Sequence, residues 1–207
     1  MDSKVYQKLS YGLYVLSIRC GKRDNACIIN TAMQLTTGPE RISFALNKAD
    51  FTCEMLDYAD DVTISVISED ADFELFRHFG FQSGRDVEKF EGFGDYARTA
   101  SGLPYITKGT NAYIEAHVEQ KIDLGTHILY IAAVTDGAVL SDVASATYAY
   151  YFAHIKPQPE KLEKVERGGK TIWRCTICGY EYEGDEVPAD FICPICKHGA
   201  DVFEKVN

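Results

Sequence analysis

Two cysteine pairs near the C-terminus constrain this chain more than any other feature of its sequence. They are Cys175-Thr-Ile-Cys178 and Cys193-Pro-Ile-Cys196, and fourteen residues separate them. Two thiolates two residues apart can bind one metal ion through a tight turn, and two such turns complete a tetrahedral site with four sulfur ligands. Two disulfides or four unrelated buried thiols are the alternatives, and they are less typical of a chain without a secretory signal. The sequence therefore predicts Cys175, Cys178, Cys193 and Cys196 as the ligands of one metal ion.

The spacing of the cysteines does not decide between iron and zinc, because a tetrahedral site of four sulfurs suits both metals. The surrounding residues favour iron. A segment this small needs large apolar side chains to build any core, and it has five, Trp173, Tyr180, Tyr182, Phe191 and Phe203.

An aromatic residue before the first pair, then C-x-x-C-G-Y, then C-P-x-C and a final Phe resemble rubredoxin over about residues 170–206. The resemblance implies a mononuclear Fe(Cys)4 centre. The segment between the pairs is short, as in the rubredoxin-like domains of rubrerythrins, and Lys197 stands where most rubredoxins have glycine. A structural zinc ribbon remains the alternative.

Length and charge limit the possible partners. The chain has 207 residues, enough for one medium domain and the small metal module, and its formal net charge is −10. Nucleic-acid binding needs a basic surface, so we expect no nucleic acid. The apolar runs are too short to cross a bilayer, and the first residues lack the layout of a secretory signal, so we expect a cytoplasmic protein without membrane contact. Cys20, Cys27 and Cys53 then read as structural thiols.

Hydrophobic patterns along the first 155 residues predict a mainly β domain. Short β-branched or aromatic runs predict strands at 11–18, 26–30, 42–47, 62–67 and 127–135, with short helices at 50–59 and 70–79 and a long loop at 80–94. The clearest alternation runs from Ala112 to Ile122, with both of these residues on the apolar face. Many short strands and few helices indicate a small antiparallel barrel. We therefore expect a β domain at 1–155, a charged linker at 156–169 and the metal domain at 170–207.

Polar residues at the start of this domain could bind a cofactor. The run Asn30-Thr-Ala-Met-Gln-Leu-Thr36 offers small polar side chains on a strand edge, and Lys48 and Thr52 lie near the expected start of a helix, where an anion is favoured. An ordinary strand, turn and helix would have the same spacing. The letters Gly92-Phe-Gly94-Asp-Tyr-Ala97 fit a dinucleotide motif, but no strand precedes them and no βαβ unit surrounds them.

Several motifs in this order resemble the flavin reductase-like FMN-binding domain over about residues 1–155. They are Asn30 to Thr36, Asn47-Lys48 with Thr52, Ser83-Gly-Arg-Asp86 with Lys89-Phe90, Thr126 to Ile131, and Thr147 to Tyr151. The resemblance implies an antiparallel split β-barrel, a homodimer, and FMN at or near the subunit interface.

The same resemblance assigns residues to the site. It implies that the isoalloxazine and ribityl chain lie against Asn30, Thr31, Ala32, Met33, Gln34 and Thr36. It implies that Asn47, Lys48, Thr52, Ser83 and Lys89 hold the ribityl chain and phosphate. His127 is expected near the nicotinamide of NAD(P)H; the alternative is a strand histidine bonded to a neighbour.

A flavin reductase-like domain followed by a rubredoxin-like domain resembles the high-molecular-weight rubredoxins of anaerobes. This implies electron transfer from NAD(P)H through FMN and iron to a partner such as a flavodiiron protein that reduces oxygen or nitric oxide. Two alternatives remain open: an electron carrier loaded by a separate NAD(P)H:rubredoxin reductase, and a zinc ribbon with an empty barrel that acts in protein binding.

Overall fold

A computed structural model describes the chain except for residues 1–4, 6–7, 158–170, 177–179, 194–198 and 207. The chain divides into two compact units, Met1–Ile155 and Lys156–Asn207. Most of the expected linker at 156–169 lies outside the described residues. Within the described part of the chain, none of the helices is long and apolar enough to cross a membrane.

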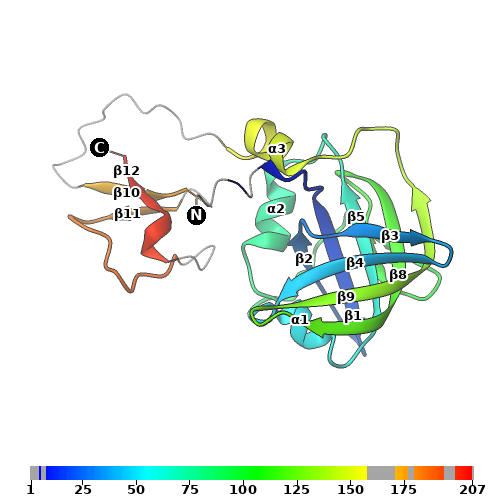
Figure 1. Cartoon of the computed structure of the whole chain (residues 1–207). Helices are drawn as coiled ribbons and strands as arrows, with labels where there is room; N and C mark the ends of the chain where they lie inside the picture. The colour runs from blue at the N-terminus through cyan, green and yellow to red at the C-terminus, as the bar shows by residue number, and fades with distance from the viewer. Residues whose placement is uncertain (1–4, 6–7, 158–170, 177–179, 194–198, 207) are drawn as a thin grey trace. The chain divides into compact units, whose positions relative to one another are not determined.

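The first unit is built on a curled seven-stranded antiparallel sheet (Figure 1). Its strand order is β2-β1-β5-β8-β9-β4-β3, so β2 and β3 form the two edges. The strands are β1 (Tyr14–Cys20), β2 (Arg23–Ile29), β3 (Met33–Thr37), β4 (Glu40–Asn47), β5 (Asp61–Ile67), β8 (Thr110–Asp123) and β9 (His127–Val139). The predicted mainly β fold with few short helices is confirmed.

The helices are shorter than the sequence predicts. The expected helix at 50–59 is α1 (Phe51–Met55); Asp50 occupies its N-cap position without a side-chain capping bond. The expected helix at 70–79 is α2 (Phe73–Gly80), which begins where the Asp72 carboxylate accepts a bond from Leu75 N at 3.2 Å. After β9, the last strand of this unit, come α3 (Tyr148–Tyr150) and a π-helical turn (Tyr151–Ile155).

Two buried clusters form the core of this unit. In one, Phe44 and Tyr130 stack with ring centroids 5.0 Å apart, and both are fully buried. The Tyr130 hydroxyl lies 3.2 Å from Cys53 Sγ, so this buried polar group has a partner. In the other, Phe76 and Phe79 of α2 pack with β1 and β2 residues. The helix covers the sheet because its apolar face has no other surface on which to be buried.

The long hairpin of β8 and β9 is present, but one predicted orientation is wrong. Ile122 was expected on the apolar face with Ala116 and Val118, and it is 40% exposed. The register between the two strands shifts between Val118 and Gln120. Since side chains alternate with a period of two, an irregularity of this kind moves later residues to the other face.

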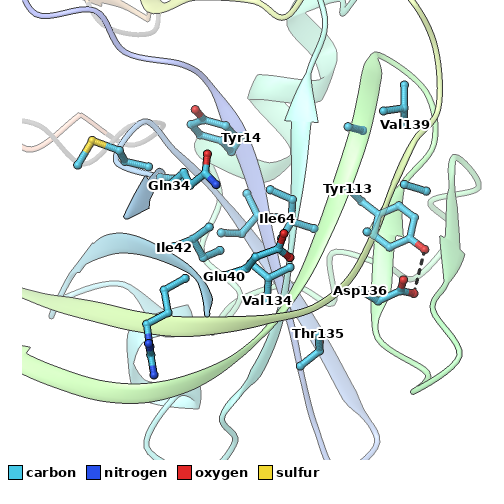
Figure 2. Close-up of a pocket in the computed structure, with 17 residues that line it drawn as sticks. Tyr14, Gln34, Glu40, Ile42, Ile64, Tyr113, Val134, Thr135, Asp136 and Val139 are labelled. Atoms are coloured by element: carbon cyan, nitrogen blue, oxygen red, sulfur yellow. Dashed lines mark hydrogen bonds between the residues drawn. The ribbon is translucent and has the colours of Figure 1, made fainter. Parts of the chain in front are cut away.

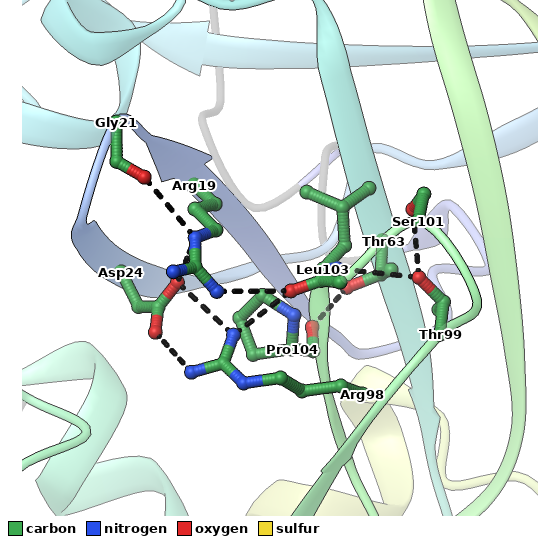
Figure 3. A network of polar contacts seen from close by, with 10 residues as sticks. Arg19, Gly21, Asp24, Thr63, Arg98, Thr99, Ser101, Leu103 and Pro104 are labelled. Carbon is green, nitrogen blue, oxygen red and sulfur yellow. Dashed lines mark hydrogen bonds and ion pairs between the residues drawn. The ribbon is translucent and has the colours of Figure 1, made fainter.

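A small hairpin that the sequence analysis did not anticipate lies beside β1 and β5. It consists of β6 (Tyr96–Arg98) and β7 (Pro104–Ile106). Figure 3 shows how it is attached: Arg98 binds the Asp24 carboxylate at 2.6 Å, and Thr63 donates to the carbonyl of Pro104 at 2.5 Å. Polar contacts therefore fix this hairpin to two strands of the main sheet, β2 and β5.

The second unit is a three-stranded antiparallel sheet with a 3-10 turn at Ala200–Val202. Its strands are β10 (Ile172–Cys175), β11 (Glu181–Glu183) and β12 (Phe203–Lys205). Trp173 donates from Nε1 to the carbonyl of Gly184 at 3.0 Å, which links β10 to the turn after β11. The predicted small C-terminal β domain is confirmed.

Candidate functional site

The first predicted cofactor segment follows the edge of the sheet. The Thr31 hydroxyl donates to Ala45 O at 2.9 Å and accepts from Ala45 N at 3.0 Å. Beyond it, β3 pairs with β4 so that Met33 is opposite Ser43 and Gln34 is opposite Ile42. The segment from Thr31 to Thr36 therefore lies along β4. The Thr31 hydroxyl takes the place of a backbone group as the hydrogen-bond partner of Ala45.

A cavity of about 580 Å³ opens beside this edge (Figure 2). Three predicted residues line it, Ala32, Met33 and Gln34, together with residues of β4, β8 and β9. Figure 2 shows Gln34 near Ile42 on one side and Tyr113 near Asp136 on another. Its size falls within the range of small-molecule sites.

The charges around this cavity favour an uncharged ring over a phosphate. Its lining includes Glu40, Asp136 and one cation, Arg41. Arg41 is already paired with Glu119, with Nε 2.6 Å from Oε2. That bond lowers the pKa of Glu119 below its ordinary value, so the pair stays ionised.

The other predicted residues gather at the opposite end of β4. Asn47, the last residue of β4, is paired with His127, the first residue of β9. Lys48 N donates to Thr126 O at 3.0 Å, so the turn before β9 is fixed to the end of β4. Asn47 lies two positions beyond Ala45, about 7 Å along a strand. The segment from Thr31 to Thr36 and the residues Asn47, Lys48 and His127 therefore lie along β4, and we call this row of residues the track.

His127 lies on this track, and the nearest partner of its side chain is the next residue back along the chain. Its Nδ1 is 2.9 Å from the Thr126 hydroxyl, and the residue is half-buried. These contacts match the alternative interpretation of a strand histidine bonded to a neighbour. A role beside the nicotinamide stays a prediction.

Lys48 and Thr52 are engaged in contacts that the sequence analysis did not foresee. The Lys48 ammonium lies 2.7 Å from both carboxylate oxygens of Asp123, and this bond lowers the pKa of Asp123. Thr52 is buried, and its hydroxyl accepts from Asn25 Nδ2 at 2.9 Å. Lys48 is exposed but paired with Asp123, and Thr52 is buried, so their expected part in holding phosphate stays a prediction.

Asn25 supplies a test of whether this end of the track fits a ligand rich in hydroxyl groups. The residue is 2% exposed, and among the described residues its Oδ1 has no hydrogen-bond partner. A buried carbonyl oxygen normally accepts a hydrogen bond, so it could accept one from a ribityl hydroxyl. Nearby, burial raises the pKa of Cys27 to about 11, so this thiol stays protonated at neutral pH. These residues fit FMN as polar partners, not as nucleophiles.

Two arginines that the site prediction omitted flank Ser83. Arg85 donates to Ala49 O at 2.9 Å and to Glu54 at 2.8 Å, and Arg23 donates to Gly84 O at 2.6 Å. Both guanidinium carbons lie over the Phe51 ring, at 4.6 Å for Arg23 and 5.5 Å for Arg85. Arginine is well suited to phosphate, but both are already paired, Arg85 with Glu54 and Arg23 with Glu88 at 2.9 Å, so their part in holding an anion near Ser83 stays a prediction. The letters Ser83-Gly-Arg85 carried the signal for Arg85; nothing in the sequence pointed to Arg23.

The structure places Lys89 differently from the prediction. The residue is 4% exposed, and its Nζ donates to Ala26 O at 2.8 Å and to Phe79 O at 2.9 Å. Burial lowers the pKa of this ammonium. The ammonium points into the protein in this structure, and the expected contact between Lys89 and a phosphate stays a prediction.

The metal centre can be assessed at two of its four predicted ligands. Cys175 ends β10 and is 1% exposed, Cys193 is 0% exposed, and both belong to one buried cluster with Phe203. Cys178 and Cys196 lie outside the described residues. Two thiols gathered in an apolar cluster fit a closed structural or electron-transfer site of four sulfurs, with no open position for a substrate.

Comparison with known proteins agrees with this two-part organisation. Residues 6–158 match the family described as flavin reductase like domain, and residues 173–204 match the rubrerythrin, rubredoxin-like domain. A high molecular weight rubredoxin from Moorella thermoacetica is 36% identical and is covered over 100% of both chains.

Two further relatives cover the first unit. A ferric-chelate reductase (NAD(P)H) from Archaeoglobus fulgidus is 35% identical over 73% of this chain and 89% of its own. The solved structure of a Streptomyces globisporus NADH:FAD oxidoreductase superposes with a TM-score of 0.64 at 17% identity, covering 70% of this chain and 84% of its own. The chain therefore belongs to the flavin reductase like family, and it joins that flavin-binding fold to a rubredoxin-like domain as a homologue of high molecular weight rubredoxin.

Proposed function

We propose that this chain carries electrons from NAD(P)H through FMN and one iron held by four cysteines to a partner protein, such as a flavodiiron oxygen or nitric oxide reductase. The observation that carries the proposal is the pairing of a flavin reductase fold with the buried cysteine cluster in one chain. FMN accepts two electrons as a hydride and releases them singly, whereas iron with four thiolates changes by one electron, so the two groups together convert one kind of donor into the other.

Different residues of the first unit would then bind different parts of FMN. Ser83 and Arg85, with Arg23 beside them, would hold the phosphate, because this end of the track concentrates guanidinium groups. Asn25 and Asn47 would bond the ribityl hydroxyl groups. Thr31, fixed to Ala45, would set the position of the ring next to the cavity.

The cavity beyond the ring would admit the nicotinamide. Its lining carries few charges and suits an uncharged ring. His127 lies at the opposite end of β4, outside this cavity, so it would contact another part of the donor. The ferric-chelate reductase relative is named for NAD(P)H, which supports this donor class.

In the second unit, Cys175 and Cys193 with Cys178 and Cys196 would hold the iron. Burial of the two described thiols would limit access of water to the metal, and hydrogen bonds near the sulfurs would tune its potential.

We also propose a cytoplasmic homodimer. Apolar side chains lie exposed around the cavity, with Met33 62% and Val139 77% exposed. Exposed apolar groups gathered at one site are typical of a protein interface. We propose that a second copy of the chain covers these exposed side chains around the cavity. Sedimentation analysis should then find two chains per particle.

Cofactor analysis of the purified chain tests this proposal. We expect one FMN and one iron per chain, with flavin and iron–thiolate absorption together. One zinc per chain without flavin would support the protein-binding alternative and contradict the proposal.

A further inference from the structure

Lys89 takes part in a set of bonds that fixes one loop of the proposed FMN site. Lys89 directly follows the segment 83–88, which contains Ser83 and Arg85. Its ammonium joins Ala26 of β2 to Phe79 of α2 through their carbonyl oxygens, at 2.8 and 2.9 Å. A cation on a carbonyl in the last turn of a helix is also favoured by the helix dipole.

His78 holds the same residue from the other side. Its Nε2 lies 2.6 Å from the carbonyl oxygen of Lys89, and its ring stacks on Phe93 with centroids 4.9 Å apart. The start of the loop is also attached to α2, since Gln82 donates from its side chain to His78 O at 2.9 Å. Both ends of the loop are therefore fixed to α2, and one is also fixed to β2.

We propose that Lys89 and His78 form a clamp that holds the segment 83–88 in the conformation that receives the FMN phosphate. Lys89 is then a positioning residue and not a phosphate ligand. This inference rests on the proposed function only for the identity of the ligand; the clamp itself is a property of the chain without cofactor.

The alternative role of Lys89 as a ligand has a cost that the clamp avoids. To reach a phosphate the ammonium would leave the Ala26 and Phe79 carbonyls, and buried acceptors would lose a charged donor. Arg85 belongs to the loop and Arg23 donates to Gly84 O at 2.6 Å, so these two guanidinium groups, now paired with Glu54 and Glu88, are nearer candidates for the phosphate than the Lys89 ammonium.

Two variants and one control test the clamp. Lys89→Met removes the ammonium. His78→Phe keeps an aromatic ring against Phe93 but removes the bond to the Lys89 carbonyl, and it leaves the ammonium in place. Arg77→Ala is the control, because it removes an exposed ion pair from the same helix.

Binding of FMN and of riboflavin, which lacks the phosphate, is measured for each protein, together with hydrogen exchange of 83–88 without cofactor. If loss of the clamp leaves about one molecule in ten with the competent loop, the Kd for FMN rises about tenfold. We expect this in both variants, with the riboflavin Kd within about twofold of wild type and faster exchange at 83–88. General destabilisation would not change the ratio of the two affinities. Arg77→Ala should change none of these values.

The inference is overturned if His78→Phe binds FMN like wild type and its loop exchanges no faster, which would leave Lys89 as a ligand. His78→Phe still decides the question if Lys89→Met does not fold. If the wild-type chain binds no FMN and both variants nevertheless loosen the loop, the clamp stands and the proposed function fails.

Discussion

Gly84 is the position at which a single methyl group should affect both stability and cofactor binding. A Cβ added there would lie 2.2 Å from Asn25 Oδ1 and 2.9 Å from Phe51 Cδ1. Separations this short are not tolerated, so the loop or the Asn25 side chain must shift. Forcing extra volume into a packed site costs about 1–3 kcal/mol, and the reduced freedom of the unfolded chain returns about 0.4–1 kcal/mol. We therefore expect Gly84→Ala to lower the free energy of unfolding by about 1–2 kcal/mol.

The matched control is Gly94→Ala, because a Cβ at Gly94 meets nothing within 4 Å. It should leave stability unchanged or raise it by up to about 1 kcal/mol. Urea unfolding gives the free energies, and quenching of flavin fluorescence gives the FMN Kd, which should rise in Gly84→Ala alone. Equal stability and equal FMN affinity of the two variants would refute the close contact between this loop and β2.

A double-mutant cycle with Asn25→Ala isolates the contact itself. Asn25→Ala alone loses the bond to Thr52, measured at 2.9 Å. Asn25→Ala also removes Oδ1, the atom with which the new Cβ of Gly84→Ala would clash. The double variant should therefore be more stable than the sum of the two single effects predicts, by about 0.5–3 kcal/mol. If the two changes in unfolding free energy simply add, the strain in Gly84→Ala does not come from a clash with Asn25.

Three further predictions concern the core, a surface pair and the metal unit. Phe44→Ala removes a fully buried ring stacked on Tyr130 and should lower the free energy of unfolding by about 3–5 kcal/mol in urea titrations; a loss below about 1 kcal/mol would mean that the site is not packed as described. The hydrogen bond that the His117 ring donates to the Asp61 carboxylate raises the pKa of His117 above 6.5, so the stabilisation is complete below pH 6.5 and is lost as pH rises through the raised pKa. NMR titration should show the ring pKa falling in Asp61→Asn, and an unchanged value would disprove the pairing. Cys193→Ser should abolish stoichiometric iron by elemental analysis while FMN remains bound, and retained iron would show that Cys193 is not a ligand.

Strong local patterns made much of the fold predictable. The alternation in β8 and the apolar face of α2 follow from burial of one side of an element, whereas the β-branched runs of β4 and β5 follow from burial of both faces of these strands. The hairpin of β6 and β7 was missed because its strands have three residues each, too few for a period to be visible, and tertiary polar contacts such as Arg98 with Asp24 hold it. The bulge that exposes Ile122 also leaves no periodic signal in the sequence.

The position of a site residue could be predicted where it follows from a single strand, and less well where it depends on contacts between distant parts of the chain. Thr31 and Gln34 could be placed because they follow one strand edge. Arg23 and Lys89 could not, because their roles depend on which residues from β2 and α2 lie opposite them in the folded chain. A lysine is expected at the surface from sequence alone, and only the packing shows that the Lys89 ammonium is buried.

Anaerobic reduction of the full chain by NADH or NADPH, followed by absorbance in a stopped-flow instrument, tests the central claim most directly. The account predicts that the flavin band bleaches first and the iron–thiolate band follows, without any added protein, and that Cys193→Ser retains only the first phase. A protein that contains both cofactors but is not reduced by either nucleotide until a separate reductase is added would contradict it.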